Sequence, residues 1–358
     1  MARAIKLAAR ALYTTDPNPR VGCVIAAGDE VVGEGYHQRA GGPHAEVLAL
    51  AAAGGLARGA TAYVTLEPCS HHGRTPPCVD ALVAAGIARV VYAVGDPNPR
   101  VNGGGVARLR EAGIDVSGGV LAASARALNP GFLSRMERGR PWVRVKLASS
   151  LDGRTALAGG ERRWITGDAA RADVQKLRAR ASALMTGVGT VLQDDPRLNV
   201  RLPGATRQPL RVVLDAGLEI SPEARILAPP GEALVMTAST DAVRAGRLAA
   251  AGARVETIDR GEGGLDLQAV MARLAELEVN ELHVESGATL AGALLQQGLV
   301  DEIVVYMAPT LLGDGARPLV GLGPLSSMED RPRLELISVR RVGGDLRLLL
   351  RPATAGRG

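Results

Sequence analysis

Hydrophobic and polar positions alternate along the first 120 residues in blocks, and the period of these blocks switches between that of a helix and that of a strand. The pattern predicts an amphipathic helix over residues 2–12 and then a β-hairpin that turns at Gly28. The hairpin strands cover 21–26 and 30–35; the later helices cover 45–53, 78–85 and 105–112, and the later strands 60–65, 90–94 and 114–116. This alternation predicts an α/β sandwich.

A second pattern of the same kind begins at residue 142. Its predicted strands, most of them separated by helices, cover 142–147, 183–186, 210–215, 233–237, 255–258, 281–284 and 302–307. Between the two patterns, residues 129–141 lose periodicity and gain charge, so we expect a boundary near residue 140. The sequence therefore predicts two α/β domains, residues 1–140 and 141–358.

Composition agrees with two soluble domains and a small substrate. The 358 residues are roughly twice the usual length of one domain. Hydrophobic residues make up 46% of the chain but aromatic residues only 2%, so Ala, Val, Leu and Ile must fill the cores. The net charge of +5 is spread without a basic run, which favours a phosphorylated small molecule over nucleic acid as partner.

The cysteines and the N-terminus favour the cytoplasm. The chain has three cysteines, Cys23, Cys69 and Cys78, and this odd, small number argues against a disulfide framework. The N-terminus lacks the apolar core of a signal peptide, and no stretch reaches the roughly 20 apolar residues of a membrane span. We therefore expect a cytoplasmic protein that does not enter a membrane.

Four residues in the first half have the chemistry of a catalytic zinc site. His44, Cys69 and Cys78 offer three ligands, which leaves the fourth tetrahedral position for water. Glu46 follows His44 at the start of a predicted helix and can carry a proton from that water to a leaving amine. Each half of the pattern is weak alone, and a structural zinc site remains open as the alternative, although such a site normally has four protein ligands.

The combination of His-x-Glu with Pro-Cys resembles the signature of zinc-dependent cytidine and tRNA adenosine deaminases. Those enzymes have Cys-x-x-Cys, whereas eight residues separate the cysteines here. The segment Thr65-Leu-Glu-Pro-Cys-Ser-His-His-Gly-Arg-Thr-Pro-Pro-Cys78 is instead similar to the deaminase half of the bifunctional riboflavin-biosynthesis deaminase-reductases. Residues 17–23 and 33–41 also match that family, and the resemblance spans nearly the whole chain.

This resemblance implies a cytidine-deaminase-like α/β/α sandwich that holds one Zn²⁺ per chain. The implied substrate is a diaminopyrimidinone with a phosphoribosylamino group, 2,5-diamino-6-(5-phosphoribosylamino)pyrimidin-4-one, which loses one exocyclic amine by hydrolysis. Side-chain chemistry adds candidate substrate contacts, because Asn18 offers a donor and an acceptor to a pyrimidine edge. His37, His71 and Arg74 are further candidates for contacts with base, ribose or phosphate. Asn18 between two prolines can also simply shape a turn, and His71 can be a solvated loop residue.

The second half lacks the Gly-x-Gly-x-x-Gly motif of a Rossmann fold after any strand. Residues 281–295 instead run from a predicted strand through Ser-Gly into a helix of small residues. Free amides and the helix dipole make such a turn an anion site, where Gly287, Thr289 and Gly292 would let a cofactor pyrophosphate approach closely. Close packing explains the small residues equally well.

Residues 145–155, 164–168 and 186–201 resemble the reductase half of the same family. The resemblance implies a dihydrofolate-reductase-like α/β domain that uses NADPH to reduce the ribosyl side chain to ribityl. The implied cofactor residues are Ala148, Trp164, Thr190, Asp194, Ala216, Gly287, Ala288, Thr289, Leu290, Ala291, Gly292 and Ala293. The implied substrate residues are Lys146, Arg162, Arg178, Leu198, Arg201 and Glu285; Arg162 departs from the small polar residue expected there.

Acid groups near the substrate can supply the proton of the reduction; Asp194 and Glu285 are candidates, neither is assigned this role, and Asp194 can equally cap the turn before Pro196. One competing interpretation is a zinc-dependent nucleoside or tRNA deaminase with an appended nucleotide-binding domain, but aromatic residues for base stacking are scarce. A second is a degenerate binding protein, against which the complete set of zinc ligands and Glu46 argues. The family resemblance also favours a homodimer or larger homo-oligomer.

Overall fold

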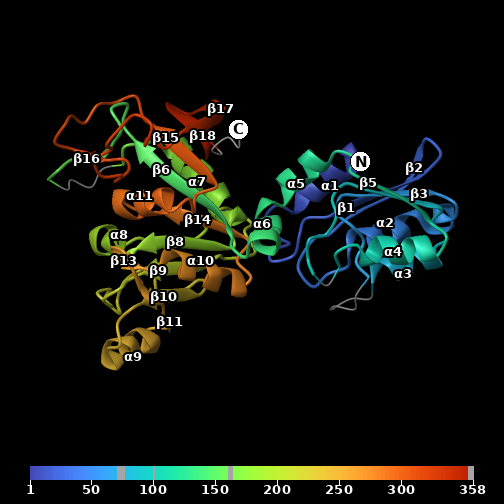
Figure 1. Cartoon of the computed structure of the whole chain (residues 1–358), viewed down its shortest axis with the longest axis horizontal. Helices are drawn as coiled ribbons and strands as arrows, with labels where there is room; N and C mark the ends of the chain where they lie inside the picture. The colour runs from blue at the N-terminus through green and yellow to red at the C-terminus, as the bar shows by residue number, and fades with distance from the viewer. Residues whose placement is uncertain (71–76, 100, 160–163, 354–358) are drawn as a thin grey trace. The chain divides into compact units, whose positions relative to one another are not determined.

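The computed structural model describes residues 1–70, 77–99, 101–159 and 164–353. The chain divides into two compact units, Met1–Arg140 and Pro141–Gly358, and both alternate strands and helices (Figure 1). In the described residues, no helix is long and apolar enough to cross a membrane.

The first unit contains a five-stranded sheet with the strand order β2-β1-β3-β4-β5. The strands are β1 (Gly22–Ala27), β2 (Glu30–Tyr36), β3 (Thr61–Val64), β4 (Arg89–Tyr92) and β5 (Asp115–Gly118). The helices are α1 (Ala2–Ala8), η1 (Ala9–Ala11), α2 (Ala45–Ala53), η2 (Gly54–Ala57), α3 (Cys78–Ala84), α4 (Gly104–Glu111), α5 (Ala122–Leu128) and α6 (Pro130–Arg138). The predicted hairpin forms, and Gly28 has the positive φ of +60° that its turn requires.

Helices cover both faces of this sheet. On β1, Cys23 and Ile25 point to one face and join a core with α2, α3 and α4, whose small and aliphatic side chains fill it. Val24 points to the other face and packs with α1, while Phe132 and Leu133 of α6 share a cluster with Ala125 of α5. The result confirms the predicted α/β/α sandwich, with Cys23 in its core.

The expectation of an aperiodic segment over residues 129–141 is wrong, because α6 occupies most of it. Pro130 begins this helix, and Gly139 ends it with a left-handed φ of +67°. Proline at the first position and glycine at the end are typical helix boundaries. Because the segment is rich in charged residues, its two adjacent core residues, Phe132 and Leu133, do not stand out in the sequence pattern.

The second unit contains a nine-stranded sheet with the order β11-β10-β9-β8-β14-β6-β15-β18-β17. These strands are β6 (Trp142–Ser149), β8 (Ala183–Gly187), β9 (Leu210–Leu214), β10 (Ala233–Thr237), β11 (Ala253–Thr257), β14 (Glu281–Glu285), β15 (Glu302–Met307), β17 (Leu334–Val342) and β18 (Asp345–Pro352). The short strands β7 (Arg154–Ala156), β12 (Arg260–Gly261), β13 (Gly264–Leu265) and β16 (Arg317–Pro318) form two small ribbons. The helices are α7 (Asp168–Arg180), α8 (Val188–Asp194), α9 (Ala242–Ala250), α10 (Leu267–Glu276) and α11 (Ala288–Gln296).

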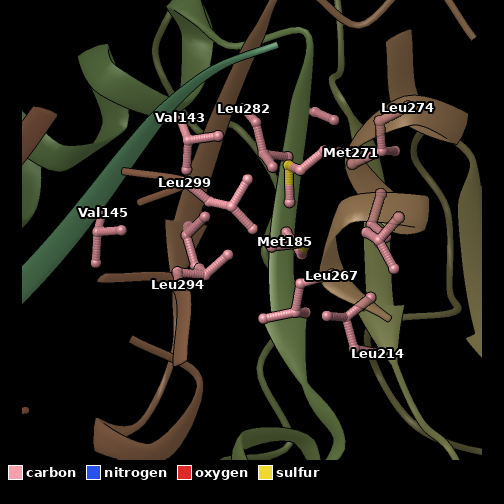
Figure 2. Packing of buried hydrophobic residues seen from close by; sticks show 14 of the residues in the cluster. Val143, Val145, Met185, Leu214, Leu267, Met271, Leu274, Leu282, Leu294 and Leu299 are labelled. Carbon is pink, nitrogen blue, oxygen red and sulfur yellow. The ribbon is translucent and has the colours of Figure 1, made fainter. Parts of the chain in front are cut away.

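The strands from β11 to β15 in this order are parallel, and the chain reverses its direction of travel across the sheet where β14 lies between β8 and β6. One face packs against α10 and α11; Figure 2 shows Leu282, Met185 and Val143 of the strands beside Met271 and Leu294 of the helices. The other face packs against α7, α8 and α9. Ligands of such sheets bind outside the carboxyl ends of the strands at the reversal point.

The sequence pattern predicts no strand beyond residue 307, yet the last two long strands, β17 and β18, extend the sheet by an antiparallel hairpin. β17 is the edge strand, and its residues are almost all exposed. A register shift between Leu336 and Ser338 interrupts the alternation of apolar and polar positions on β17, which is why the sequence pattern does not reveal this strand.

Candidate active sites

The three predicted zinc ligands converge in the first unit. Cys69 Sγ lies 3.6 Å from His44 Nδ1 and 3.3 Å from Cys78 Sγ, and His44 Nδ1 lies 2.8 Å from Cys78 Sγ. In the described residues these three form the only group of donor atoms close enough to hold a metal ion. Two sulfurs and one imidazole nitrogen are the donor set of a catalytic zinc, so the residues present fit this ion.

The local structure explains this convergence. His44 is the residue that precedes α2, and Cys78 is the first residue of α3, so two helix N-termini meet at the site. Cys69 comes from the loop that follows β3, and its sulfur accepts a hydrogen bond from the Cys78 backbone N–H at 3.3 Å. The positive ends of both helices favour a thiolate.

The pKa values of the two cysteines move in opposite directions. A hydrogen bond from the Cys78 thiol is the largest effect that lowers the pKa of Cys69 to about 4, and bonds from His44 and the Cys78 backbone act in the same sense. The same thiol–thiolate bond, together with burial, raises the pKa of Cys78. The bond between the two sulfurs therefore favours the thiolate form at Cys69 over Cys78.

Glu46 lies in the first turn of α2 and is 3% exposed. Burial raises its pKa above the usual range, while the neighbouring His44 acts in the opposite sense. A buried carboxyl beside the ligands is suited to accept and return a proton during a hydrolysis. Its place agrees with the predicted role.

Asn18 and His37 form a hydrogen-bonded pair next to the zinc ligands. His37 Nδ1 lies 3.0 Å from the Pro43 carbonyl, which can only accept, so the hydrogen-bond network assigns the proton to Nδ1. His37 Nε2 then accepts from Asn18 Nδ2 at 3.1 Å. Burial lowers the pKa of His37, and its ring meets that of His44 edge-on at 5.6 Å between centroids. Two of the four predicted pyrimidine contacts thus come together.

Three predicted site residues, His71, Arg74 and Arg162, lie outside the described residues. Glu67 of the deaminase motif, by contrast, is described, and the sequence predicts no role for it. It is buried, and its carboxylate accepts hydrogen bonds from backbone amides 29 to 39 residues further along the chain. No local spacing could reveal these partners.

In the second unit, α7 and β14 bring Arg178 and Glu285 together. Arg178 Nε donates to Glu285 Oε1 at 2.6 Å and Nη2 donates to Oε2 at 2.9 Å, a bidentate pair. His283 Nε2 lies 3.3 Å from the same carboxylate. Burial alone would raise the pKa of Glu285, but Arg178, His283 and Lys146 hold it well below the usual range.

Lys146 on β6 is the neighbour of Glu285 in the sheet register. Burial lowers its pKa, and the adjacent Arg178 acts in the same sense, while Glu285 opposes both. Within the described parts of the chain, Lys146 forms no hydrogen bond or ion pair, unlike Arg178, whose Nη1 donates to the Asn199 carbonyl at 3.2 Å. Lys146 is therefore a half-buried cation with its donors available to a ligand.

Leu198 and Arg201 lie on the loop that follows α8. Arg201 Nη1 donates to Asn199 Oδ1 at 2.9 Å, and its backbone N–H donates to Gln175 Oε1 of α7 at 2.8 Å. Leu198 is buried with a left-handed φ of +43°. Arg178 and Arg201 thus share Asn199 as a hydrogen-bond partner. The sequence predicts no role for Asn199.

The carboxyl ends of the parallel strands carry buried polar atoms that suit a large polar ligand. In the described residues, no hydrogen-bond partner is present for Thr186 Oγ1 near the end of β8, Asp215 Oδ1 after β9 or Ser286 Oγ after β14. A Cβ added to Gly287 or Gly189 would meet nothing within 4 Å. Unpaired buried polar atoms are rare, so they indicate bound groups, and these fit a dinucleotide at the reversal point of the sheet.

The predicted cofactor segment separates into two parts. Gly287 and Thr289 are exposed at the start of α11, whereas Ala291 is a core residue. A Cβ on Gly292 would lie 1.9 Å from the Gly321 carbonyl oxygen, so close packing explains this glycine. The other predicted cofactor residues are half-buried. They are Ala148 on β6, Thr190 on α8, Ala216 directly after β9, and Ala288, Leu290 and Ala293 on α11.

Trp164 and Asp194 are two further exposed members of the predicted set. Trp164 is 78% exposed, and the Arg171 guanidinium lies 5.3 Å from its ring centroid. Asp194 ends α8 and is exposed, and the neighbouring Asp195, not Asp194, accepts the Arg225 backbone N–H at 2.8 Å. Within the described residues, neither Trp164 nor Asp194 forms a hydrogen bond with Arg178 or Glu285.

Two family models match the chain, one within each unit. Residues 1–94 match the cytidine and deoxycytidylate deaminase zinc-binding region, and residues 141–348 match the RibD C-terminal domain. The riboflavin biosynthesis protein RibD of Escherichia coli is 52% identical over 98% of this chain and 98% of its own length. The protein of the same name from Haemophilus influenzae is 46% identical over 98% of this chain and 96% of its own length.

Solved structures show the same similarity over both units. Acinetobacter baumannii RibD superposes with a TM-score of 0.92 at 46% identity, covering 99% of this chain and 98% of that one. A Thermotoga maritima diaminohydroxyphosphoribosylaminopyrimidine deaminase/5-amino-6-(5-phosphoribosylamino)uracil reductase gives 0.85 at 34% identity, covering 99% and 97%.

Proposed function

The chain belongs to the RibD family of riboflavin biosynthesis proteins, and from this premise we propose which residues perform its reactions. It is a bifunctional enzyme with a zinc-binding deaminase and a reductase, and its substrates are small phosphorylated pyrimidines. We propose that residues 1–140 deaminate 2,5-diamino-6-(5-phosphoribosylamino)pyrimidin-4-one. We propose that residues 141–358 then reduce the ribosyl side chain of the product to ribityl.

For the deaminase, we propose that His44, Cys69 and Cys78 hold one Zn²⁺, which acts as a Lewis acid that makes water nucleophilic at neutral pH. Glu46 removes a proton from the attacking water and delivers it to the amine that leaves as ammonia. Asn18 reads the pyrimidine edge, and His37 fixes its amide by accepting from Asn18 Nδ2. The convergence of the three ligand atoms with Glu46 is the observation that carries this proposal.

For the reductase, NADPH is the hydride source of this family. We propose that it lies along the strand ends at Thr186, Asp215 and Ser286, with the first turn of α11 at its phosphates. Opening of the ribosylamine ring gives an imine whose carbon accepts the hydride and whose nitrogen accepts a proton. Arg178 and Arg201 bind the substrate phosphate.

Lys146 is the best candidate for the proton donor. Glu285 cannot serve in its ordinary state, since Arg178 and its other neighbours keep it ionised. Asp194 is exposed at the end of α8. Lys146 combines a lowered pKa with unoccupied donors beside Glu285. We therefore propose that Lys146, rather than Asp194 or Glu285, protonates the imine.

We also propose a cytoplasmic homo-oligomer. None of the three cysteines forms a disulfide, and the two that we propose as zinc ligands need a reducing compartment. The exposed edge strand β17 carries apolar side chains that a second copy can cover. The alternative, a nucleoside or tRNA deaminase with an appended nucleotide-binding domain, is disfavoured because relatives match along both halves together.

Glu46→Gln tests the deaminase assignment. We expect zinc content to stay at the wild-type level while deamination falls by about 100-fold or more, because the amide cannot carry the proton. Reduction of pre-deaminated substrate should persist in the same preparation. The measurement is zinc stoichiometry together with the two separate rates.

The exposed Glu30→Gln on β2 is the matched control and should keep both rates. Wild-type deamination by Glu46→Gln would remove Glu46 from the mechanism. Loss of both activities would indicate instead that the variant chain is damaged as a whole.

A further inference from the structure

The buried carboxylate of Glu67 is surrounded by backbone amides. Its Oε2 accepts hydrogen bonds from the amides of Asp96 and Gly103, and its Oε1 from those of Gly105 and Val106, each at 3.2 Å. The side chain belongs to a residue that is 5% exposed. Among the described residues no cation forms an ion pair with it, and the partners of its charge there are these four amides.

Three of these amides belong to the start of α4. The residue before this helix is Gly103, which has a left-handed φ of +83° and no side chain that could cap the helix. The first amides of a helix need an acceptor, and the helix dipole favours a negative one. Glu67 supplies that acceptor from a distant loop.

The same helix turn presses against the residues on either side of Cys69. A Cβ on Gly105 would lie 1.9 Å from the Pro68 carbonyl oxygen, and a Cβ on Gly104 would lie 2.9 Å from Ser70 Oγ. At Gly105, backbone therefore meets backbone with no room for a side chain. The loop that carries Cys69 rests directly on α4.

We infer that Glu67 is a positioning residue, which fixes the Cys69 sulfur for zinc by fastening its loop to the N-terminus of α4. On the other side, the loop is held by Cys78, whose backbone N–H bonds Cys69 Sγ at 3.3 Å, and by Val79, whose N–H bonds the Cys69 carbonyl at 3.3 Å. The inference rests on the proposed zinc site. It adds a group that contacts neither metal nor substrate but that sets the metal's affinity and geometry.

The test compares Glu67→Gln with the wild-type full-length chain. The amide replaces one acceptor oxygen by a donor that faces two backbone N–H groups, so the shape is kept and half of the hydrogen bonds are lost. We expect zinc to be released to excess chelator roughly 10- to 100-fold faster, the range typical for lost outer-shell partners of metal ligands. In Co²⁺-substituted protein, the visible bands that report the thiolate ligands should shift, which a purely structural role would not cause in folded protein.

Glu111→Gln is the matched control, since Glu111 is an exposed carboxylate at the other end of α4. Gly105→Ala is a second variant, which pushes the Cys69 loop away and leaves the charge of Glu67 unchanged. It should also release zinc faster. If Glu67→Gln does not fold, the release rate of Gly105→Ala decides.

Wild-type release rates and cobalt spectra in Glu67→Gln, or in Gly105→Ala where that variant decides, would overturn the inference. These outcomes are distinct from failure of the zinc site itself. In that case the wild-type chain would hold no zinc, and no variant would need to be compared.

Discussion

Glu285 shows how one residue type takes different roles in the two units. Glu46 is buried with a raised pKa, whereas Glu285 is buried with a strongly lowered one, because Arg178 contacts both of its oxygens. The raised pKa suits the first to hold and return a proton, and the second stays ionised and orients its partner. Environment, rather than residue type, assigns the role.

Glu285→Gln should weaken reduction and leave deamination unchanged. The neutral amide cannot hold both Arg178 nitrogens, and a hydrogen bond to a charged group contributes about 1.5–3 kcal/mol. We therefore expect kcat/KM of the reduction to fall roughly 10- to 150-fold. NADPH oxidation with pre-deaminated substrate measures this.

The exposed Glu262→Gln should reduce its substrate at the wild-type rate. An unchanged kcat/KM in Glu285→Gln would show that the Arg178 pair has no part in the reaction. A parallel loss of deamination would point to misfolding.

The residue types of the zinc site could be predicted because their chemistry is local in sequence. His44 and Glu46 share one turn, and a single loop leads from Cys69 to Cys78. Glu67 and Lys146 could not be assigned their roles in this way. The partners of Glu67 come from another loop, and the importance of Lys146 depends on the burial and pairing of Arg178 and Glu285, which only the fold determines.

At the scale of elements, helix α7 is tied to the C-terminal hairpin by one carboxylate. Asp173 Oδ2 accepts hydrogen bonds from the Tyr306 hydroxyl at 2.7 Å and from Arg340 Nη2 at 2.7 Å, and Arg347 Nε lies at 3.4 Å. Burial acts to raise the pKa of Asp173, but Tyr306 and the two arginines bring it below the usual value. The group connects α7, β15, β17 and β18.

Asp173→Asn should destabilise the second unit at pH 7 by about 1–3 kcal/mol, since it leaves Tyr306 and the arginines poorly paired. The folded pKa is lowered, so this stabilisation is present above the unfolded pKa and is lost as pH falls through the folded one. The difference from wild type should therefore shrink below about pH 4. Urea unfolding of the variant and the wild type at pH 7 and below about pH 4 measures this difference in stability. An equal difference at the two pH values would refute its ionic origin.

Most buried elements could be predicted from periodicity, and the exposed ones could not. α2, β10 and β15 have the predicted bounds because their apolar residues face a core. β17 was missed because a register shift interrupts its alternation and nearly all of its residues are exposed, and α6 because its charges surround two core residues. In both cases tertiary contacts, rather than pattern, decide the structure.

At the scale of the whole molecule, β17 suggests how two copies meet. Leu336 and Val339 on this edge strand are 53% and 50% exposed. An antiparallel contact between two copies centred on Ser338 would place Glu335 of one copy opposite Arg341 of the other. Such a two-fold contact is self-complementary and covers the open edge.

Val339→Glu should therefore convert the proposed oligomer into monomers of 37.0 kDa, because residue 339 faces Ile337 of the other copy in this register. A buried, unpaired charge on each side of the contact opposes association. Light scattering after size exclusion measures the molar mass, and Leu56→Glu, exposed in the first unit, is the control. A wild-type monomer, or an unchanged mass in the variant, would exclude this interface.

The central claim is that one chain performs both reactions in sequence, and mass spectrometry of the products tests it most directly. Zinc-loaded wild-type protein is given the diaminopyrimidinone ribosyl phosphate with and without NADPH. We expect replacement of one amine by oxygen without NADPH, and the same change plus a hydride and a proton with it. Recovery of unchanged substrate from the zinc-loaded protein under both conditions would contradict the account.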